Sequence, residues 1–131
     1  MVSLNPFTAD LISETAHNEA RNCLGKDTDA TSQLRKFYDE LVMWHTNVFS
    51  VPDETAQTAR YERCAPYIQM LRAKAAYAEG RGLVSMSFLT MFDSVIAGIK
   101  SKEDLKHAKL FMEAFMGFLK FERVAKGVEK R

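Results

Sequence analysis

Residues 31–49 read TSQLRKFYDELVMWHTNVF, and this stretch is the clearest indication of the fold class. Its apolar and aromatic positions recur every three or four residues, which is the spacing of one face of an α-helix. These positions are Leu34, Phe37, Tyr38, Leu41, Trp44, His45 and Val48. The sequence therefore predicts an amphipathic helix that begins at an N-cap at Asp29 or Thr31 and ends near Phe49.

Four further segments show the same helical spacing, at about 8–24, 54–79, 85–99 and 101–126. No segment shows the two-residue alternation of a half-buried strand. Asp53 and Ser101 are suited to cap the helices that follow them, and Pro66 predicts a kink or a division into two helices. The sequence thus predicts an all-α fold, a compact bundle of about five helices.

The last of these segments carries more aromatic residues than one helix face can hold. Its core-facing stripe contains Leu105, Ala108, Met112, Phe115 and Leu119. Phe111, Phe118 and Phe121 widen the apolar arc beyond that stripe. We therefore expect this helix to lie at the centre of the bundle, or to present one flank to a partner.

The composition indicates a single globular domain. The chain has 131 residues, of which 47% are hydrophobic and 27% charged, and these shares exclude a disordered protein. Its two cysteines, Cys23 and Cys64, form no C-x-x-C pair and are typical of reduced thiols. No signal-peptide pattern and no apolar run of about 18 residues is present, so we expect a cytoplasmic protein without a membrane segment.

The net charge of +1 conceals an uneven distribution along the chain. Residues 1–30 hold two basic and five acidic side chains, whereas residues 31–131 hold 16 basic and 12 acidic ones. These counts predict an acidic N-terminal helical segment with a linker at 1–30, and a helical-bundle core at 31–131. Because local fields steer a polyanion, the total charge alone does not exclude nucleic-acid binding.

No arrangement of residues indicates an active site. Glu14 and His17 have the E-x-x-H spacing of carboxylate-bridged di-metal bundles, but such proteins need this pair twice. Glu40 and Glu113 are each followed three residues later by methionine, so a second pair is missing. Phosphate loops and nucleophile elbows are also absent. We expect no catalytic residues, metal or cofactor, and a ferritin-like enzyme is the weakest alternative.

Basic residues in two of the predicted helices are the candidate binding residues. Arg35 and Lys36 lie early in the helix at 31–49, Arg72 and Lys74 lie in the helix at 54–79, and Arg81 follows its end. Alanines between the last three leave room for another backbone to approach. Two interpretations remain open at this point: an ordinary solvated face, or a shallow basic groove that follows a phosphate backbone.

Two ordered motifs resemble the small subunit of the type III-A CRISPR effector, the Csm complex. Residues 31–37, TSQLRKF, are similar to that family's T-S-Q-[IL]-R-K-[FL] signature. Residues 71–81, LRAKAAYAEGR, are similar to its L-[KR]-x-K-x-A-Y-x-x-G-R block. A weaker third match is FMEA at 111–114, which resembles the family's C-terminal F-x-E-A helix. The three matches occur in the family's order and extend over most of the chain.

The resemblance implies a compact, all-helical, non-catalytic structural subunit. Copies of such a subunit stack along the inner face of the complex, and their partners are the backbone and large subunits, neighbouring copies, the crRNA and the target RNA. The RNA-binding residues that the resemblance implies are Arg35, Lys36, Arg72, Lys74 and Arg81. By the same comparison, Phe37 and Tyr77 are expected to be packing residues.

Both ends of the chain depart from the family pattern. The acidic residues before Asp27 match none of its motifs, and the C-terminal helix lacks a Y-H-[KR] ending. Two alternatives remain open beside the type III-A subunit. One is the equivalent small subunit of a type III-B effector, and the other is a helical protein-interaction module that binds no nucleic acid.

Overall fold

The computed structural model describes residues 2–24 and 29–130. These residues form a π-helical turn and five α-helices: η1 (Leu11–Thr15), α1 (Ala16–Asn22), α2 (Thr31–Phe49), α3 (Glu54–Gly80), α4 (Met86–Ala97) and α5 (Lys102–Ala125). Within the described ranges no strand occurs, and the predicted all-α bundle is confirmed. Gly25, which is suited to end the helical segment predicted at 8–24, lies outside the described residues.

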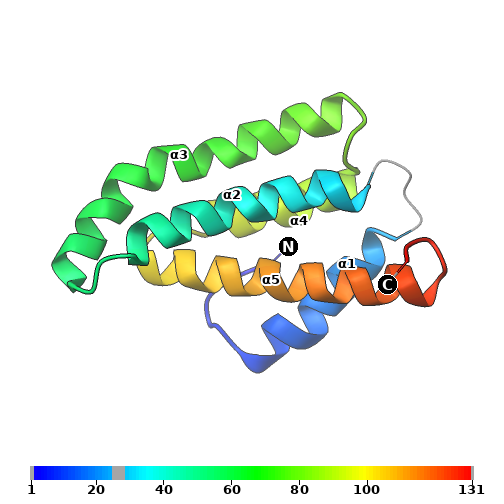
Figure 1. Ribbon diagram of the computed structural model, residues 1–131, viewed down its shortest axis with the longest axis horizontal. Helices are drawn as coiled ribbons and strands as arrows, with labels where there is room; N and C mark the ends of the chain where they lie inside the picture. Colours follow the sequence, from blue (N-terminus) through cyan, green and yellow to red (C-terminus); the bar gives the residue numbers. More distant parts are fainter. Residues whose placement is uncertain (1, 25–28, 131) are drawn as a thin grey trace.

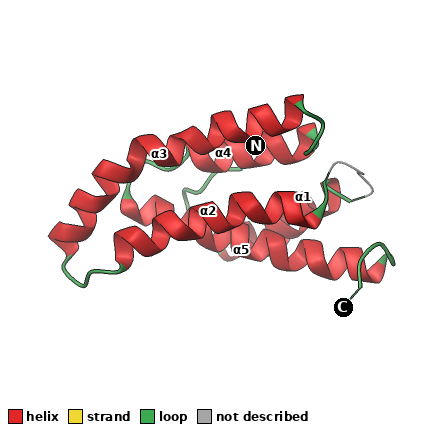
Figure 2. Ribbon diagram, turned by 45° about the horizontal axis from the view of Figure 1, so that its top comes forward, coloured by secondary structure: helices red, strands yellow, loops and turns green. Residues whose placement is uncertain are grey.

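The helices pack as two antiparallel pairs with α1 added on one side. α3 lies beside α4, and α2 lies beside α5, as Figure 2 shows. α2 also contacts α3, so the two pairs form one bundle, while α1 packs on the far side of α5 (Figure 1). The predicted central position of α5 is therefore confirmed, because this helix contacts α1, α2 and α3.

The core is built from phenylalanines of α4 and α5. Phe88 and Phe92 are fully buried and stack with their ring centroids 5.3 Å apart. Phe115 of α5 packs against Phe88 at 6.2 Å, and Phe37 of α2 closes the cluster at 5.7 Å from Phe88. Burying one such ring contributes about 1.5–3 kcal/mol, so this cluster is a main source of stability. The predicted packing role of Phe37 is confirmed.

α2 begins at Thr31, but the predicted N-cap is wrong. Ala30 occupies that position and no side chain caps the helix. Asp29 is instead fully buried and accepts a hydrogen bond of 2.7 Å from the backbone N–H of Ser85, at the start of α4. The Ser85 hydroxyl donates to the same carboxylate, and Arg123 of α5 donates to the Asp29 carbonyl. The aspartate therefore joins three segments that are distant in sequence.

α3 is continuous across Pro66, so the predicted division into two helices is wrong. Figure 1 shows that the helix is bent, as the alternative prediction of a kink requires. Pro66 lies on the exposed side of α3, where water can satisfy the carbonyl that loses its partner. The predicted cap at Asp53 is confirmed, because its side chain accepts a 2.8 Å hydrogen bond from the Ala56 N–H.

α3 ends at Gly80, close to the end of the segment predicted at 54–79, and a second glycine shapes the turn that follows. Arg81 is the C-cap, and Gly82 adopts a left-handed conformation with φ of 74°. The N–H groups of Gly82 and Leu83 donate to the carbonyls of Glu79 and Ala78, which is the pattern of a Schellman motif. This turn directs the chain back along α3 into α4.

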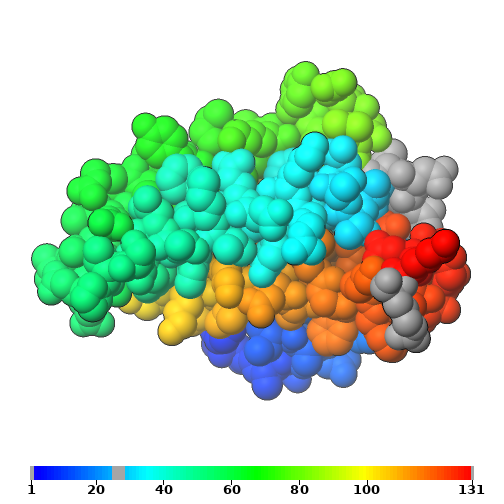
Figure 3. Space-filling view, in the orientation of Figure 1, coloured from blue at the N-terminus to red at the C-terminus, as the bar shows by residue number. Residues whose placement is uncertain are grey.

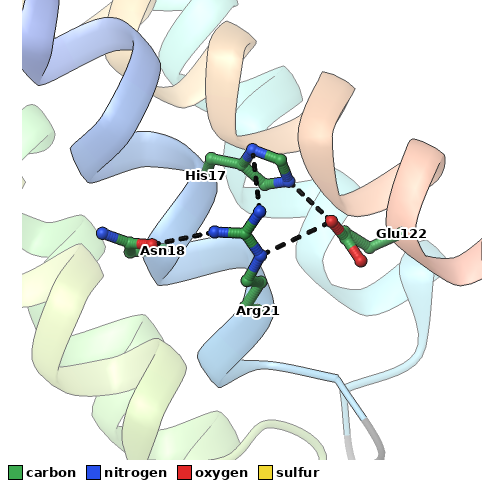
Figure 4. Close-up of polar contacts among 4 residues, drawn as sticks. All are labelled: His17, Asn18, Arg21 and Glu122. Carbon is green, nitrogen blue, oxygen red and sulfur yellow. Dashed lines mark hydrogen bonds and ion pairs between the residues drawn. The ribbon is translucent and has the colours of Figure 1, made fainter.

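α1 is held against α5 by a partly buried polar cluster, shown in Figure 4. Nε2 of His17 lies 2.6 Å from Oε2 of Glu122, and Nε of Arg21 lies 3.6 Å from the same oxygen. The His17 ring stacks on Phe118 with the centroids 4.3 Å apart. His17 is thus a packing and pairing residue of the α1–α5 contact, and its partner is Glu122 rather than Glu14.

Two further observations concern the cysteines and the expected absence of a membrane segment. Both Cys23 and Cys64 are buried. Along the described parts of the chain, no helix combines the length and the apolar character that a bilayer span requires.

The Glu122 contact predicts a pH-dependent contribution to stability. The hydrogen bond with His17, together with nearby Arg21, holds the pKa of the Glu122 carboxyl below its usual range. Since the folded-state pKa is the lower one, this contribution is present above the unfolded value of about 4.3 and is lost as the pH falls through the folded-state pKa. When the pH is lowered from about 6 to about 3, we expect the melting temperature of Glu122→Gln to fall less than that of the unmodified protein.

The measurement is the melting temperature by circular dichroism across that pH range. Glu103→Gln is the matched control, because Glu103 is an exposed glutamate of the same helix. The control should keep the full acid dependence. Equal acid losses in Glu122→Gln and in the unmodified protein would contradict a role for this carboxylate in pH-dependent stability.

Candidate nucleic-acid interface

The contact between α2 and α3 determines which side chains reach the surface along this face. Three contacts run antiparallel along it: Cys64 Sγ with Asn47 Oδ1 at 3.4 Å, the Trp44 and Tyr67 rings at 5.7 Å, and Lys74 Nζ with Glu40 Oε2 at 3.0 Å. Extending this register by one helical turn places Lys36 beside the turn of α3 that carries Tyr77. Figure 3 shows this face of the molecule, with α2 across the front and α3 along its upper edge.

α3 buries one stripe of residues with alternating spacings of three and four: Tyr61, Cys64, Ile68, Leu71, Ala75 and Ala78. The residues immediately before them repeat the same spacing about 100° around the helix. They are Arg60, Arg63, Tyr67, Met70, Lys74 and Tyr77, and Arg81 continues the series. We call these seven residues the basic–aromatic stripe.

The stripe combines exposed flat or apolar side chains with cations. Tyr67 is 60% exposed and Tyr77 is 66% exposed, and Met70 is also exposed. The Arg81 guanidinium lies 5.7 Å from the centre of the Tyr77 ring, within the range of a cation–π contact. The acidic residues of α3 (Glu54, Glu62 and Glu79) fall outside the stripe. From Arg60 to Arg81, 21 residue steps apart, it extends roughly 32 Å along the helix.

Two cations of the stripe make polar contacts with α2 and with the residue that follows it. Nη1 of Arg60 donates to the Asn47 carbonyl and to the Ser50 hydroxyl, each at 2.9 Å. Lys74 pairs with Glu40, but its side chain is 51% exposed. An ion pair this exposed contributes only about 0–1 kcal/mol, so an incoming phosphate can replace the carboxylate at little cost.

The structure does not gather the five predicted residues into one site. Lys74 and Arg81 lie on the stripe, and Lys36 lies beside it on α2. Arg72 points to the other side of α3, where its guanidinium makes a two-pronged contact with Asp93 of α4 at 2.8 and 3.3 Å. This contact raises the pKa of Arg72. Arg35 approaches Asp39 of its own helix at 3.9 Å.

Tyr77 was expected to pack in the core, and this expectation is wrong. The buried stripe passes through Ala75 and Ala78, and Tyr77 is directed outward between them. Arg60, Arg63 and Tyr67 were not among the predicted site residues. The signal that could have identified them is the alternating three- and four-residue spacing from position 60 to position 81.

A second exposed surface lies where α1 meets α5. Ala114, Gly117, Phe118 and Phe121 form a shallow apolar hollow next to His17. Phe121 is 62% exposed, whereas Phe118 is half-buried under His17 and Phe111 is fully buried. We call these four residues the α5 apolar patch. The widened apolar arc of this helix therefore serves both the core and the surface.

No metal-ligand set forms in the part of the chain that the structure describes. Groups of three or more His, Cys, Asp or Glu side chains close enough to hold an ion do not occur there. Glu14 is exposed, and His17 is occupied by Glu122. The E-x-x-H spacing therefore brings no ligands together in the described structure.

Comparisons with known proteins agree with the sequence motifs. The family model described as Csm2 Type III-A matches residues 8–124. No curated protein and no solved structure matches the chain. The family match extends from the first helical turn to the end of α5, so it includes both the stripe and the α5 apolar patch. The chain belongs to the Csm2 family, the small subunit of the type III-A Csm complex.

Proposed function

We propose that the chain is a non-catalytic structural subunit of the type III-A Csm complex that contacts the crRNA–target RNA through basic residues of α2 and α3. In this proposal several copies stack along the inner face of the filament, beside the backbone and large subunits, in the cytoplasm. The observation that supports RNA contact is the basic–aromatic stripe, in which four cations follow one helix face without an intervening acid. The alternative of a type III-B subunit is disfavoured by the family match.

The proposed contact surface is centred on the stripe. Lys36, Lys74 and Arg81 remain from the predicted set, and Arg60 and Arg63 are added because they continue the same face. Arg72, which pairs with Asp93 on the other side of α3, and Arg35, which approaches Asp39 of its own helix, lie outside this surface and are assigned secondary roles. Such a surface suits a subunit that reads no sequence, since pairing between guide and target supplies the sequence information in such complexes.

Weak contacts are sufficient for this role when copies act together. A few exposed cations per chain give a low affinity, but neighbouring copies on one filament raise the effective concentration of each further contact. Stacking along a filament requires head-to-tail contacts that do not close on themselves. The α5 apolar patch lies on the opposite side of the bundle from α3 (Figure 1) and is our candidate for one such contact.

The salt dependence of RNA binding tests the contact surface. Each phosphate contact to a single strand contributes a slope of about 0.7 in a plot of log affinity against log salt concentration. We expect the double variant Lys74→Ala/Arg81→Ala to reduce that slope by roughly 1.4 and to weaken binding at low salt. Fluorescence anisotropy with a labelled RNA strand measures both quantities.

The matched control for this test is Lys100→Ala/Lys106→Ala, which removes two exposed lysines, one just before α5 and one near its start. We expect the control to keep the slope of the unmodified protein. A slope that stays the same in Lys74→Ala/Arg81→Ala would remove the stripe from the RNA contact. It would also favour the alternative of a protein-interaction module.

The α5 apolar patch is tested by the number of copies in the assembled complex. We expect Phe121→Glu to lower that number, because the charge falls on an exposed ring without disturbing the core. Native mass spectrometry of the reconstituted complex gives the count. Met86→Glu, at another exposed apolar side chain, is the control and should assemble normally. Full occupancy with Phe121→Glu would exclude the patch as a contact between copies.

A further inference from the structure

The three apolar members of the basic–aromatic stripe are not explained by phosphate contact. A surface that only followed a backbone would need cations, yet Tyr67, Met70 and Tyr77 are each more than half exposed on the stripe. No described helix covers them, because α3 lies at the edge of the bundle in both Figure 1 and Figure 2. These side chains form an exposed face whose ligand must contain flat apolar groups as well as negative charge.

We propose that the stripe binds unpaired RNA, with bases stacking on Tyr77 and Tyr67 while the phosphates contact the neighbouring cations. This inference rests on the proposed function and specifies that the part of the RNA in contact with the stripe is unpaired. In an A-form duplex the base faces are covered by their neighbours, so only the backbone and the base edges in the grooves are available. In a single strand each base offers a flat face to an aromatic ring.

The order of residues along the stripe fits such a strand. Each tyrosine has a cation one helical turn away on the same face: Arg63 before Tyr67, Lys74 before Tyr77, and Arg81 after Tyr77. A base and its own phosphate can therefore be engaged by adjacent side chains. The Arg81 guanidinium already lies near the Tyr77 ring, so a cation is within reach of the phosphate of a base that stacks on this ring.

The two tyrosines differ in how they are supported. Tyr67 stacks on Trp44 with an interplanar angle of 17°, so its ring is fixed from below and offers its other face outward. Tyr77 contacts the Arg81 guanidinium, and its removal leaves the helix packing intact. A substitution at Tyr77 therefore disturbs fewer packing contacts than one at Tyr67. Trp44 is the single tryptophan of the chain, so its fluorescence reports on a base that binds at Tyr67.

The test compares one RNA in two forms. A labelled strand of roughly 12 nucleotides is titrated with the full-length protein, first alone and then paired with its complement. We expect Tyr77→Ala to weaken single-strand binding at least about fivefold, and Tyr77→Phe to stay within about twofold of the unmodified protein. Duplex binding by Tyr77→Ala should change by less than about twofold. Met86→Ala, which removes an exposed apolar side chain of α4, is the control and should bind as the unmodified protein does.

Trp44 emission gives a second measurement that a merely structural role would not change. A base that stacks on Tyr67 should alter Trp44 fluorescence, whereas the duplex should not. Absence of this change with the single strand would contradict base stacking at Tyr67.

The outcomes separate this inference from the proposed function. Loss of binding in Lys74→Ala/Arg81→Ala without loss in Tyr77→Ala overturns the stacking inference and leaves the RNA contact standing. Equal losses for single strand and duplex in Tyr77→Ala also overturn it. If none of these variants changes RNA binding, both the stacking inference and the proposed RNA contact are overturned. If Tyr77→Ala affects only the assembly of copies, the stripe is a protein contact and the stacking inference is overturned.

Discussion

Burial of one continuous stripe of α3 against α2 and α4 is the constraint on which the outer surface of the protein depends. Ile68, Leu71 and Ala75 are fully buried at spacings of three and four, so the rotation of this long helix is fixed along its length. Every residue one position earlier is then turned by about 100° toward α2 and solvent. The exposed tyrosines and cations of the stripe follow from that packing.

The same packing explains why a chain with a net charge of +1 can present a basic surface. The carboxylates of α3 lie on other sides of the helix than the stripe. The excess of acidic residues lies before residue 31, outside both α2 and α3. Lys74 is only lightly neutralised by Glu40, because an exposed pair is weak. Charge position, rather than total charge, therefore determines what this surface can bind.

Much of the fold could be predicted from local patterns. The apolar spacing of α2, α4 and α5 identified their buried faces, and the caps at Asp53 and Ser101 are local contacts. Asp29 shows the limit of such patterns, because its partner Ser85 is 56 residues away and no local signal specifies it. Pro66 was ambiguous for a related reason: a proline interrupts a helix only where its surroundings cannot satisfy the freed carbonyl.

The candidate site was predictable in part. Motif resemblance identified Lys74 and Arg81, but it grouped them with Arg72, which the geometry of α3 turns toward Asp93. Tyr77 was misassigned because the motif resemblance implied a packing residue, and only the rotation of α3 shows it to be exposed. That rotation depends on the contacts of α3 with α2 and α4, and these contacts cannot be predicted from the sequence of α3 alone.

The most direct test of the account is ultraviolet crosslinking of RNA in the reconstituted Csm complex, followed by tryptic mapping of this subunit. We predict that the crosslinked peptides are residues 64–72, which contain Tyr67, and residues 75–81, which contain Tyr77. Crosslinks confined to residues 110–120 of α5, with none on α3, would contradict the account.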